Sequence, residues 1–189
     1  GGVVRRELTI VGTPANMTAK QIRQFGSWSC VAQEGVFDFE GLTMDAYSDR
    51  KICVFSRGNS IISILAVVDD SVTYSNVWLC STQDNRLEAY ISGVYREFEI
   101  SLLENDFENT IADIEIETGK VKQLTIKNDT ISGKVLRVSN TAVEIDGYGS
   151  VDIADNFRVY KNYGILEEKS IDDILVGYEL ADFVVADGK

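Results

Sequence analysis

Short runs of alternating or β-branched residues, separated by Gly, Asn, Asp and Ser, follow one another along almost the whole chain. Alternation with a period of two is typical of strands with one buried face, and the separating residues are typical of turns. Closely spaced short strands favour a barrel or sandwich over an alternating α/β fold. The sequence therefore predicts an all-β protein. The expected strands lie near residues 4–11, 28–32, 36–40, 43–47, 52–56, 60–68, 72–80, 86–91, 94–102, 111–117, 121–127, 131–138, 142–146, 150–153, 157–160 and 182–186.

A weak internal sequence similarity divides these strands into two sets. Residues 31–55 read like residues 138–160, and similar strings follow at residues 60–65 and 170–175. Matching offsets are what two tandem copies of one β-rich unit would give, although alternating apolar residues also match by chance. We therefore expect two tandem small units, each barrel-like or sandwich-like, and leave open whether they arose by duplication.

The boundary between the units is expected where the alternation lapses. Residues 104–110 are polar and acidic, and Pro14 is the only proline, so no proline-rich linker marks another boundary. The predicted units are an N-terminal β-rich unit of residues 1–108 and a C-terminal small β-barrel-like unit of residues 109–189.

Helical signals are few. Residues 17–25 contain a capping Thr18 and end before Gly26, which predicts one short helix in the N-terminal unit. Residues 167–175 fit a second single turn, with Ser170 as the cap and acidic residues in the first turn. The fold is therefore expected to be mainly β with one or two short helices.

The charge of the chain limits its partners. The chain contains 18 Lys and Arg and 30 Asp and Glu, which gives a net charge of −12. Nucleic-acid binding rests largely on cationic side chains that displace counterions, so nucleic acid is not an expected partner. Acidic residues spread along the whole chain favour a solubilising surface over a cation site. No apolar run approaches the roughly 18 residues of a membrane helix, so membrane insertion by this segment is not expected.

Three cysteines, Cys30, Cys53 and Cys80, form neither a disulfide framework nor a zinc motif. Each stands among apolar residues, which favours small core residues. A reactive thiol needs an electropositive neighbourhood, and only Cys53, near Arg50 and Lys51, has a trace of one.

Histidine is absent from the chain. Its absence removes the Ser-His-Asp and Cys-His nucleophile pairs and the commonest neutral metal ligand. The Gly147–Gly149 string lacks the third glycine and the following helix of a dinucleotide loop. The sequence therefore assigns no catalytic residue, no cofactor-binding residue, no cofactor and no metal ligand.

Two acidic groups are candidates for chemistry. Asp113, Glu115 and Glu117 alternate and so share one strand face, which favours a solvated face of a half-buried strand. A second group brackets a tight turn and offers oxygens for calcium, but the EF-hand spacing is missing and ordinary turn residues are favoured. That second group is Asp146, Asp152, Asp155 and Asn156.

Aromatic residues offer a further candidate surface, because exposed rings can stack on sugar rings. Most of them are expected to be buried in the core or in an interface. The residues are Trp28, Trp78, Tyr74, Tyr90, Tyr95, Tyr148, Tyr160 and Tyr163.

The C-terminal half resembles the segment that precedes the catalytic domain in long clostridial proteins of the stage II sporulation protein D (SpoIID)/LytB family. Residues 1 to about 110 resemble the region before it, through strings such as Phe39–Tyr47. The C-terminal strings that carry the resemblance are Ile131–Val138, Val143–Gly149, Phe157–Lys161, Ile174–Tyr178 and Asp182–Lys189.

The resemblance implies a role at the cell wall. In that family the C-terminal domain works on peptidoglycan, as a lytic transglycosylase or in support of an amidase, with a glutamate as general acid in a Leu-x-x-Tyr-Leu-x-Gly-Val-Val type motif. This chain stops before such a motif, so Glu167, Glu168 and Glu179 receive no catalytic role. The chain starts Gly1-Gly2 without a leader, which we interpret as a fragment whose signal or anchor lies elsewhere.

Three functions are therefore weighed. The leading hypothesis is a non-catalytic extracytoplasmic β module that positions or regulates a peptidoglycan hydrolase domain, with peptidoglycan or another cell-wall or sporulation protein as partner. The second is a glycan-acting enzyme built on a carboxylate pair between the two units. The third is a protein-interaction platform whose partner adds a strand at an exposed edge. The sequence leaves the oligomeric state open.

Overall fold

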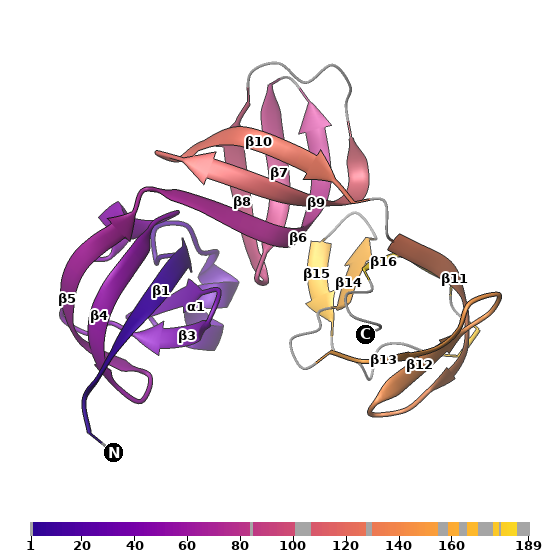
Figure 1. Cartoon of the computed structure of the whole chain (residues 1–189), viewed down its shortest axis with the longest axis horizontal. Helices are drawn as coiled ribbons and strands as arrows, with labels where there is room; N and C mark the ends of the chain where they lie inside the picture. Colours follow the sequence, from indigo (N-terminus) through magenta and orange to yellow (C-terminus); the bar gives the residue numbers. More distant parts are fainter. Residues whose placement is uncertain are drawn as a thin grey trace. The chain divides into compact units, whose positions relative to one another are not determined.

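The computed structural model describes residues 2–83, 85–100, 107–127, 130–154, 159–162, 166–169, 176–177 and 179–184. Strands dominate it, which confirms the predicted all-β fold (Figure 1). The chain divides into two compact units, Gly1–Ile126 and Lys127–Lys189.

The unit boundary differs from the expected one at residues 108 and 109. The strand β9 (Glu108–Glu117) pairs with β6 (Ser71–Gln83), and β10 (Lys120–Ile126) pairs with β9, so both belong to the first unit. The lapse in alternation therefore precedes another strand of the same sheet.

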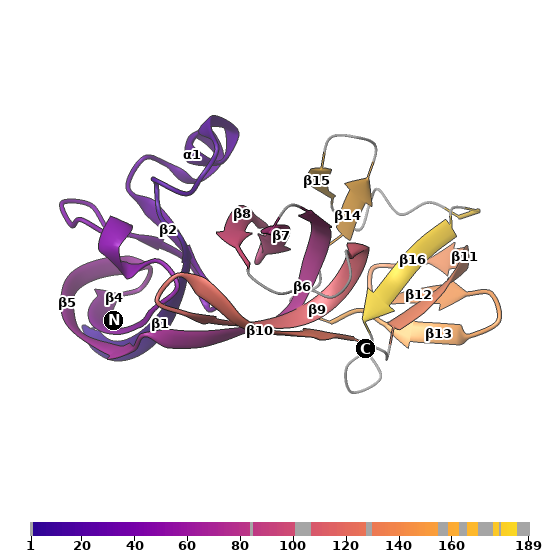
Figure 2. The same ribbon diagram turned by 90° about the horizontal axis from the view of Figure 1, so that it is seen from above.

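A closed five-stranded barrel forms the start of the first unit. Its strand order is β1-β2-β3-β5-β4, with one parallel contact, Asp38 to Ser60, between β3 and β5 (Figures 1 and 2). This is the order of an OB-type Greek-key barrel. The strands are β1 (Val4–Gly12), β2 (Ser29–Ala32), β3 (Gly35–Asp38), β4 (Lys51–Arg57) and β5 (Ser60–Asp69). The barrel core consists of Leu8, Ile10, Cys30, Ala32, Phe37, Phe39, Met44, Ile52, Val54 and Ile61.

The expected helix is confirmed as α1 (Ala19–Phe25), between β1 and β2. Thr18 caps it and forms a capping box with Gln21, which satisfies two backbone donors at the helix start. Gly26 ends it with a φ of 101°, a conformation that favours glycine.

Two local expectations are wrong. Residues 45–47, expected in a strand, form the 3-10 helix η1 (Asp45–Tyr47). Residues 167–169, expected in a second helical turn, lie in β15 (Leu166–Lys169), where pairing with β14 (Val159–Asn162) overrides the local capping signal; residues 170–175 lie outside the described residues.

A five-stranded antiparallel sheet completes the first unit, in the order β10-β9-β6-β7-β8. Its remaining strands are β7 (Arg86–Ile91) and β8 (Val94–Glu99). The sheet curls until its edge strands β10 and β8 approach each other. Its concave side buries apolar residues that include Tyr74, Leu79 and Ile114, and Ile22 and Phe25 of α1 pack against the same cluster.

A buried ion pair joins the barrel to this sheet. Both guanidinium ends of Arg96 on β8 donate to Asp49, which precedes β4, at 2.8 and 2.7 Å. The Tyr74 hydroxyl donates to the same carboxylate at 2.8 Å, and Arg96 also donates to the carbonyl of Val11. Only 7% of the Arg96 side chain and 3% of Asp49 are exposed. We call Arg96, Asp49 and Tyr74 the clasp.

The second unit contains a four-stranded sheet, in the order β13-β12-β11-β16, and the β14–β15 hairpin. The sheet strands are β11 (Thr130–Val138), β12 (Ala142–Ile145), β13 (Gly149–Asp152) and β16 (Glu179–Val184). The two similar segments, residues 31–55 and 138–160, differ in structure. The second contains β13, whereas the corresponding part of the first leads into η1. The internal duplication is therefore not confirmed.

Candidate functional site

A pocket of about 220 Å³ lies on the barrel of the first unit. One wall comes from the chain between β1 and β2, and the other from the segment between β3 and η1. The backbone N–H of Phe39 donates to the carbonyl of Trp28 at 2.8 Å, which holds the two segments together. A turn follows, in which the N–H of Leu42 donates to the Phe39 carbonyl at 2.9 Å. The lining residues are Pro14, Ser27, Trp28, Cys30, Phe39, Leu42, Thr43, Met44 and Asp45.

The pocket has an apolar floor and a polar rim. Cys30, Phe39 and Met44 belong to the buried barrel core, whereas 52% of Trp28 is exposed. Ser27, Thr43 and Asp45 bring hydroxyl and carboxylate groups to the same hollow. Pockets for drug-sized ligands measure about 300–1,000 Å³. The smaller volume here fits one ring of a ligand against the indole, with hydrogen bonds from the rim.

The thiol in this pocket is held in its protonated form at neutral pH. Burial, followed by the nearby Asp45 carboxylate, raises the pKa of Cys30 to about 12. Burial and the Glu88 carboxylate likewise raise the pKa of Cys80 to about 12. All three cysteines are free and buried, so the prediction of core residues is confirmed, including for Cys53.

A second, wider hollow of about 350 Å³ is lined by Asn16, Tyr95, Arg96 and Glu97. Its polar groups already contact one another: the Tyr95 hydroxyl donates to Glu97 at 2.9 Å, and Arg86 forms an ion pair with Glu97. The hydrogen bond from Tyr95 lowers the pKa of Glu97, with a further contribution from Arg86. Glu97 is therefore held as a carboxylate and is a poor general acid.

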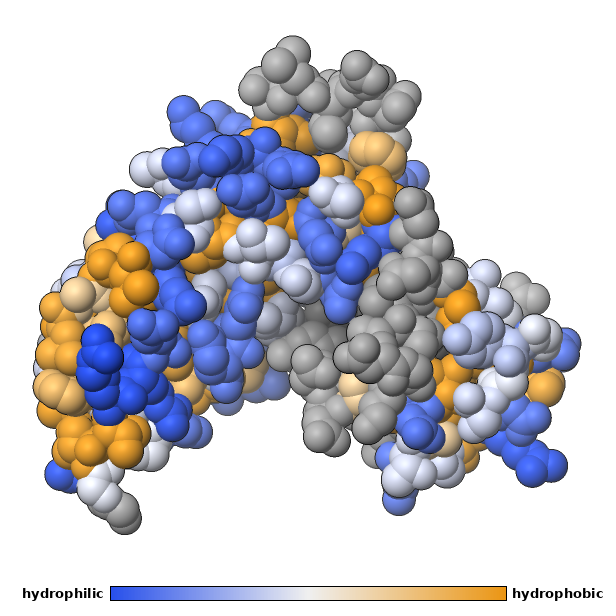
Figure 3. Space-filling view, viewed as in Figure 1, coloured by the Kyte–Doolittle hydropathy of each residue, from blue (hydrophilic) through white to orange (hydrophobic). Residues whose placement is uncertain are grey.

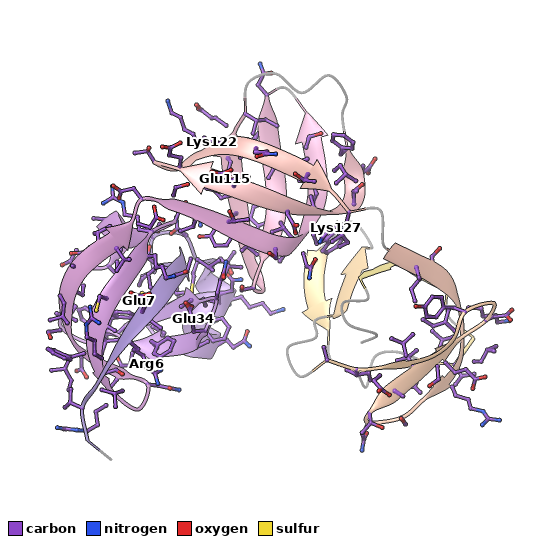
Figure 4. All side chains as sticks on the ribbon, in the orientation of Figure 1. Arg6, Glu7, Glu34, Glu115, Lys122 and Lys127 are labelled. Carbon is purple, nitrogen blue, oxygen red and sulfur yellow. The ribbon has the colours of Figure 1, made fainter. Side chains whose placement is uncertain are left out.

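The acidic strand face is confirmed as a solvated face. Along β9 the intervening Ala112, Ile114 and Ile116 are fully buried, so Asp113, Glu115 and Glu117 project from the opposite side. The ammonium nitrogen of Lys122 on β10 lies 3.6 Å from a carboxylate oxygen of Glu115 (Figure 4). It lies 3.1 Å from a carboxylate oxygen of Glu117. Asp113 accepts a hydrogen bond from the Asn76 backbone at 3.0 Å.

The candidate calcium group is only partly described. Asp146 and Asp152 are exposed, and Asp155 and Asn156 lie outside the described residues. Within the described ranges, no group of three or more Cys, Asp or Glu side chains is placed to hold a metal ion.

The aromatic residues divide into buried and exposed sets. Tyr74 and Trp78 are buried; Trp78 stacks on Tyr90, and Tyr90 meets Tyr95 edge to face, each pair with centroids 5.6 Å apart. Trp28 and Tyr148 are each 52% exposed. The side chains of Tyr160 and Tyr163 lie outside the described part of the chain.

One acidic residue was missed by the sequence patterns. Glu34, at the turn between β2 and β3, accepts hydrogen bonds from the backbone N–H of Thr9 at 2.8 and 3.2 Å (Figure 4). Burial raises its pKa, against these hydrogen bonds. Because both oxygens face the β1 backbone, Glu34 serves the barrel and lines neither hollow.

The fold and the pocket define a β-barrel protein with a small, aromatic-walled surface site. In the part of the chain that the structure describes, no helix combines the length and the apolar character needed to cross a bilayer. Comparison with family models, with curated proteins and with solved structures finds no match.

Proposed function

We propose that this chain is a non-catalytic extracytoplasmic β module that positions or regulates a peptidoglycan hydrolase domain, and that it touches the glycan through the Trp28 pocket. The observation that carries the glycan contact is the exposed indole beside an apolar floor and three polar rim residues. The resemblance to the SpoIID/LytB family motivates the cell-wall setting.

The chemistry of the pocket suits a sugar ring. The apolar face of a pyranose packs against an aromatic ring, while its hydroxyls need partners such as those of Ser27, Thr43 and Asp45. OB-type barrels bind oligosaccharides and oligonucleotides on the face of strands two and three and on adjoining loops. The net charge of −12 disfavours the second class. Asp45 likewise favours uncharged N-acetylglucosamine units over carboxylate-bearing sugars.

Neither of the two hollows described in the first unit offers the carboxylate pair on which the enzyme alternative was built. Each of the two hollows contains a single carboxylate, Asp45 in one and Glu97 in the other. Glycoside hydrolysis commonly needs two carboxylates about 5–9 Å apart across the bond.

Glycan binding is tested by titrating the chain with soluble β-1,4-linked N-acetylglucosamine oligomers and by pull-down on purified sacculi. We expect Trp28→Ala to weaken binding about tenfold, as removal of a central aromatic contact does. The fluorescence of Trp28 should change on binding, and the buried Trp78 remains as an internal reference. Tyr148→Ala is the matched control, because Tyr148 is equally exposed but lies in the second unit. Equal retention of wild-type chain and Trp28→Ala would contradict the proposal.

A further inference from the structure

The Trp28 pocket carries one charged group. Of its lining residues only Asp45, the first residue of η1, is charged at neutral pH, and it is exposed. The next acidic residue along the chain, Asp49, is neutralised by Arg96 in the clasp. Among the residues that the structure describes, no Lys or Arg forms an ion pair with Asp45. An unpaired carboxylate beside an open hollow attracts a cationic ligand more than a neutral one.

The charge of Asp45 acts inside the pocket. Burial first, and then this carboxylate, raise the pKa of the Cys30 thiol to about 12. Cys30 is fully buried and forms part of the pocket floor. The carboxylate is therefore close enough to the floor to interact with the charge of a ligand that is held there.

The aromatic wall attracts a ligand of the same charge. The face of an indole ring is electronegative and attracts an ammonium group that lies within about 6 Å of the ring centre. Trp28 is half exposed and lines the same hollow as Asp45. The hydroxyl groups of Ser27 and Thr43 are also exposed and form no hydrogen bond within the described part of the chain. These four side chains therefore suit a hydroxylated ligand that carries a positive charge.

We infer that the pocket binds a glucosamine unit with a free amino group in preference to an N-acetylglucosamine unit. The inference rests on the proposed glycan contact and names the sugar that this contact selects. The sugar ring packs on Trp28, and the ammonium group at its C2 pairs with Asp45. N-acetylation removes the positive charge, so an acetylated unit keeps the ring contact and loses the ion pair. Exposed ion pairs and exposed cation–π contacts are each weak, so we expect the free amine to bind about fivefold more tightly.

The test needs a probe with a single positive charge. The net charge of −12 attracts any polycation, and hydrophilic residues, blue in Figure 3, are spread over the face of the molecule shown there. A fully deacetylated oligomer would therefore bind without the pocket. The probes are two β-1,4-linked trisaccharides, one fully N-acetylated and one with a single free amino group. Both are titrated at about pH 6, where that amino group is protonated.

Calorimetric titration measures the ratio of the two dissociation constants. We expect Asp45→Asn to reduce the preference for the free amine to about twofold, the part that the indole supplies. Glu40→Gln is the matched control and should keep the full preference, because Glu40 is exposed and close in sequence but does not line the pocket. Equal binding of the two trisaccharides, or a preference that both variants lower equally, would overturn the inference and leave the glycan contact standing. Failure of both trisaccharides to bind would overturn the glycan contact as well.

A second titration identifies the source of the amine. Nα-acetyl-lysine amide offers the same ammonium group on an alkyl stem, as a peptide side chain does, but it has no pyranose ring and no sugar hydroxyls. We expect it to bind more weakly than the trisaccharide with the free amino group, because it leaves Ser27 and Thr43 without partners. Binding at least as tight as that of this trisaccharide would assign the pocket to a peptide amine and overturn the inference.

Discussion

At the residue scale, the clasp is a buried ionic contact between the barrel and the sheet of the first unit. Asp49 and Arg96 form a bidentate pair with almost no exposure, and Tyr74 adds a third hydrogen bond. A buried pair costs desolvation of both charges, so its net contribution is modest. Removal of one partner is far more damaging, because the other charge is left buried.

Substitutions in the clasp should therefore lower the free energy of unfolding by different amounts. We expect Asp49→Asn to lower the free energy of unfolding by about 3 kcal/mol, and Tyr74→Phe, which leaves the ion pair intact, by about 1 kcal/mol. Urea unfolding at neutral pH measures both. Glu97→Gln is the control on the same strand as Arg96, since its ion pair with Arg86 is exposed and should matter little. Equal losses for Asp49→Asn and Glu97→Gln would refute the central role of the clasp.

At the element scale, the sequence predicted the parts whose signals are local. Thr18, Gln21 and Gly26 identify α1 because caps act within a few residues. The unit boundary was wrong because β9 pairs with β6, far away in the sequence. The sequence named Trp28 as one of several aromatic candidates but favoured burial for most of them, because the exposure of a Trp near a strand start depends on how two loops meet.

The turn between β9 and β10 gives a prediction at this scale. Thr118 and Gly119 have φ values of 52° and 75°, the left-handed pair of a type I′ hairpin. Thr118→Asn should raise the midpoint of thermal unfolding, because Asn tolerates this conformation better than a β-branched residue. Gly119→Ala should lower stability by about 1 kcal/mol. A change in stability of the same sign for both variants would contradict this prediction.

At the scale of the whole molecule, the buried thiols predict how stability depends on pH. Cys30 and Cys80 ionise in the folded chain at a pKa of about 12, against an ordinary value of 9.0. Between these values the unfolded chain releases more protons than the folded one, so stability falls as pH rises from about 9 towards 12 and is unaffected below that window. Urea midpoints measured from neutral to alkaline pH check this.

A double variant separates the thiols from other alkaline groups. Cys30→Ala with Cys80→Ala should show a shallower decline above about pH 9 than the wild-type chain. The wild-type thiols should also react with a disulfide reagent at the rate of unfolding, because both are buried. An identical pH profile for the two proteins would exclude the thiols as the cause.

The clasp also limits where this chain can be truncated without loss of the first unit. A shortened chain that ends after β5 keeps the aspartate of the barrel but loses Arg96, the cation that neutralises it, together with the Tyr74 hydroxyl. Its buried carboxylate would be left without the hydrogen bonds and the cation that compensate its burial. The barrel and the curled sheet therefore depend on each other, and a shortened form of this protein should keep residues 1–126 together.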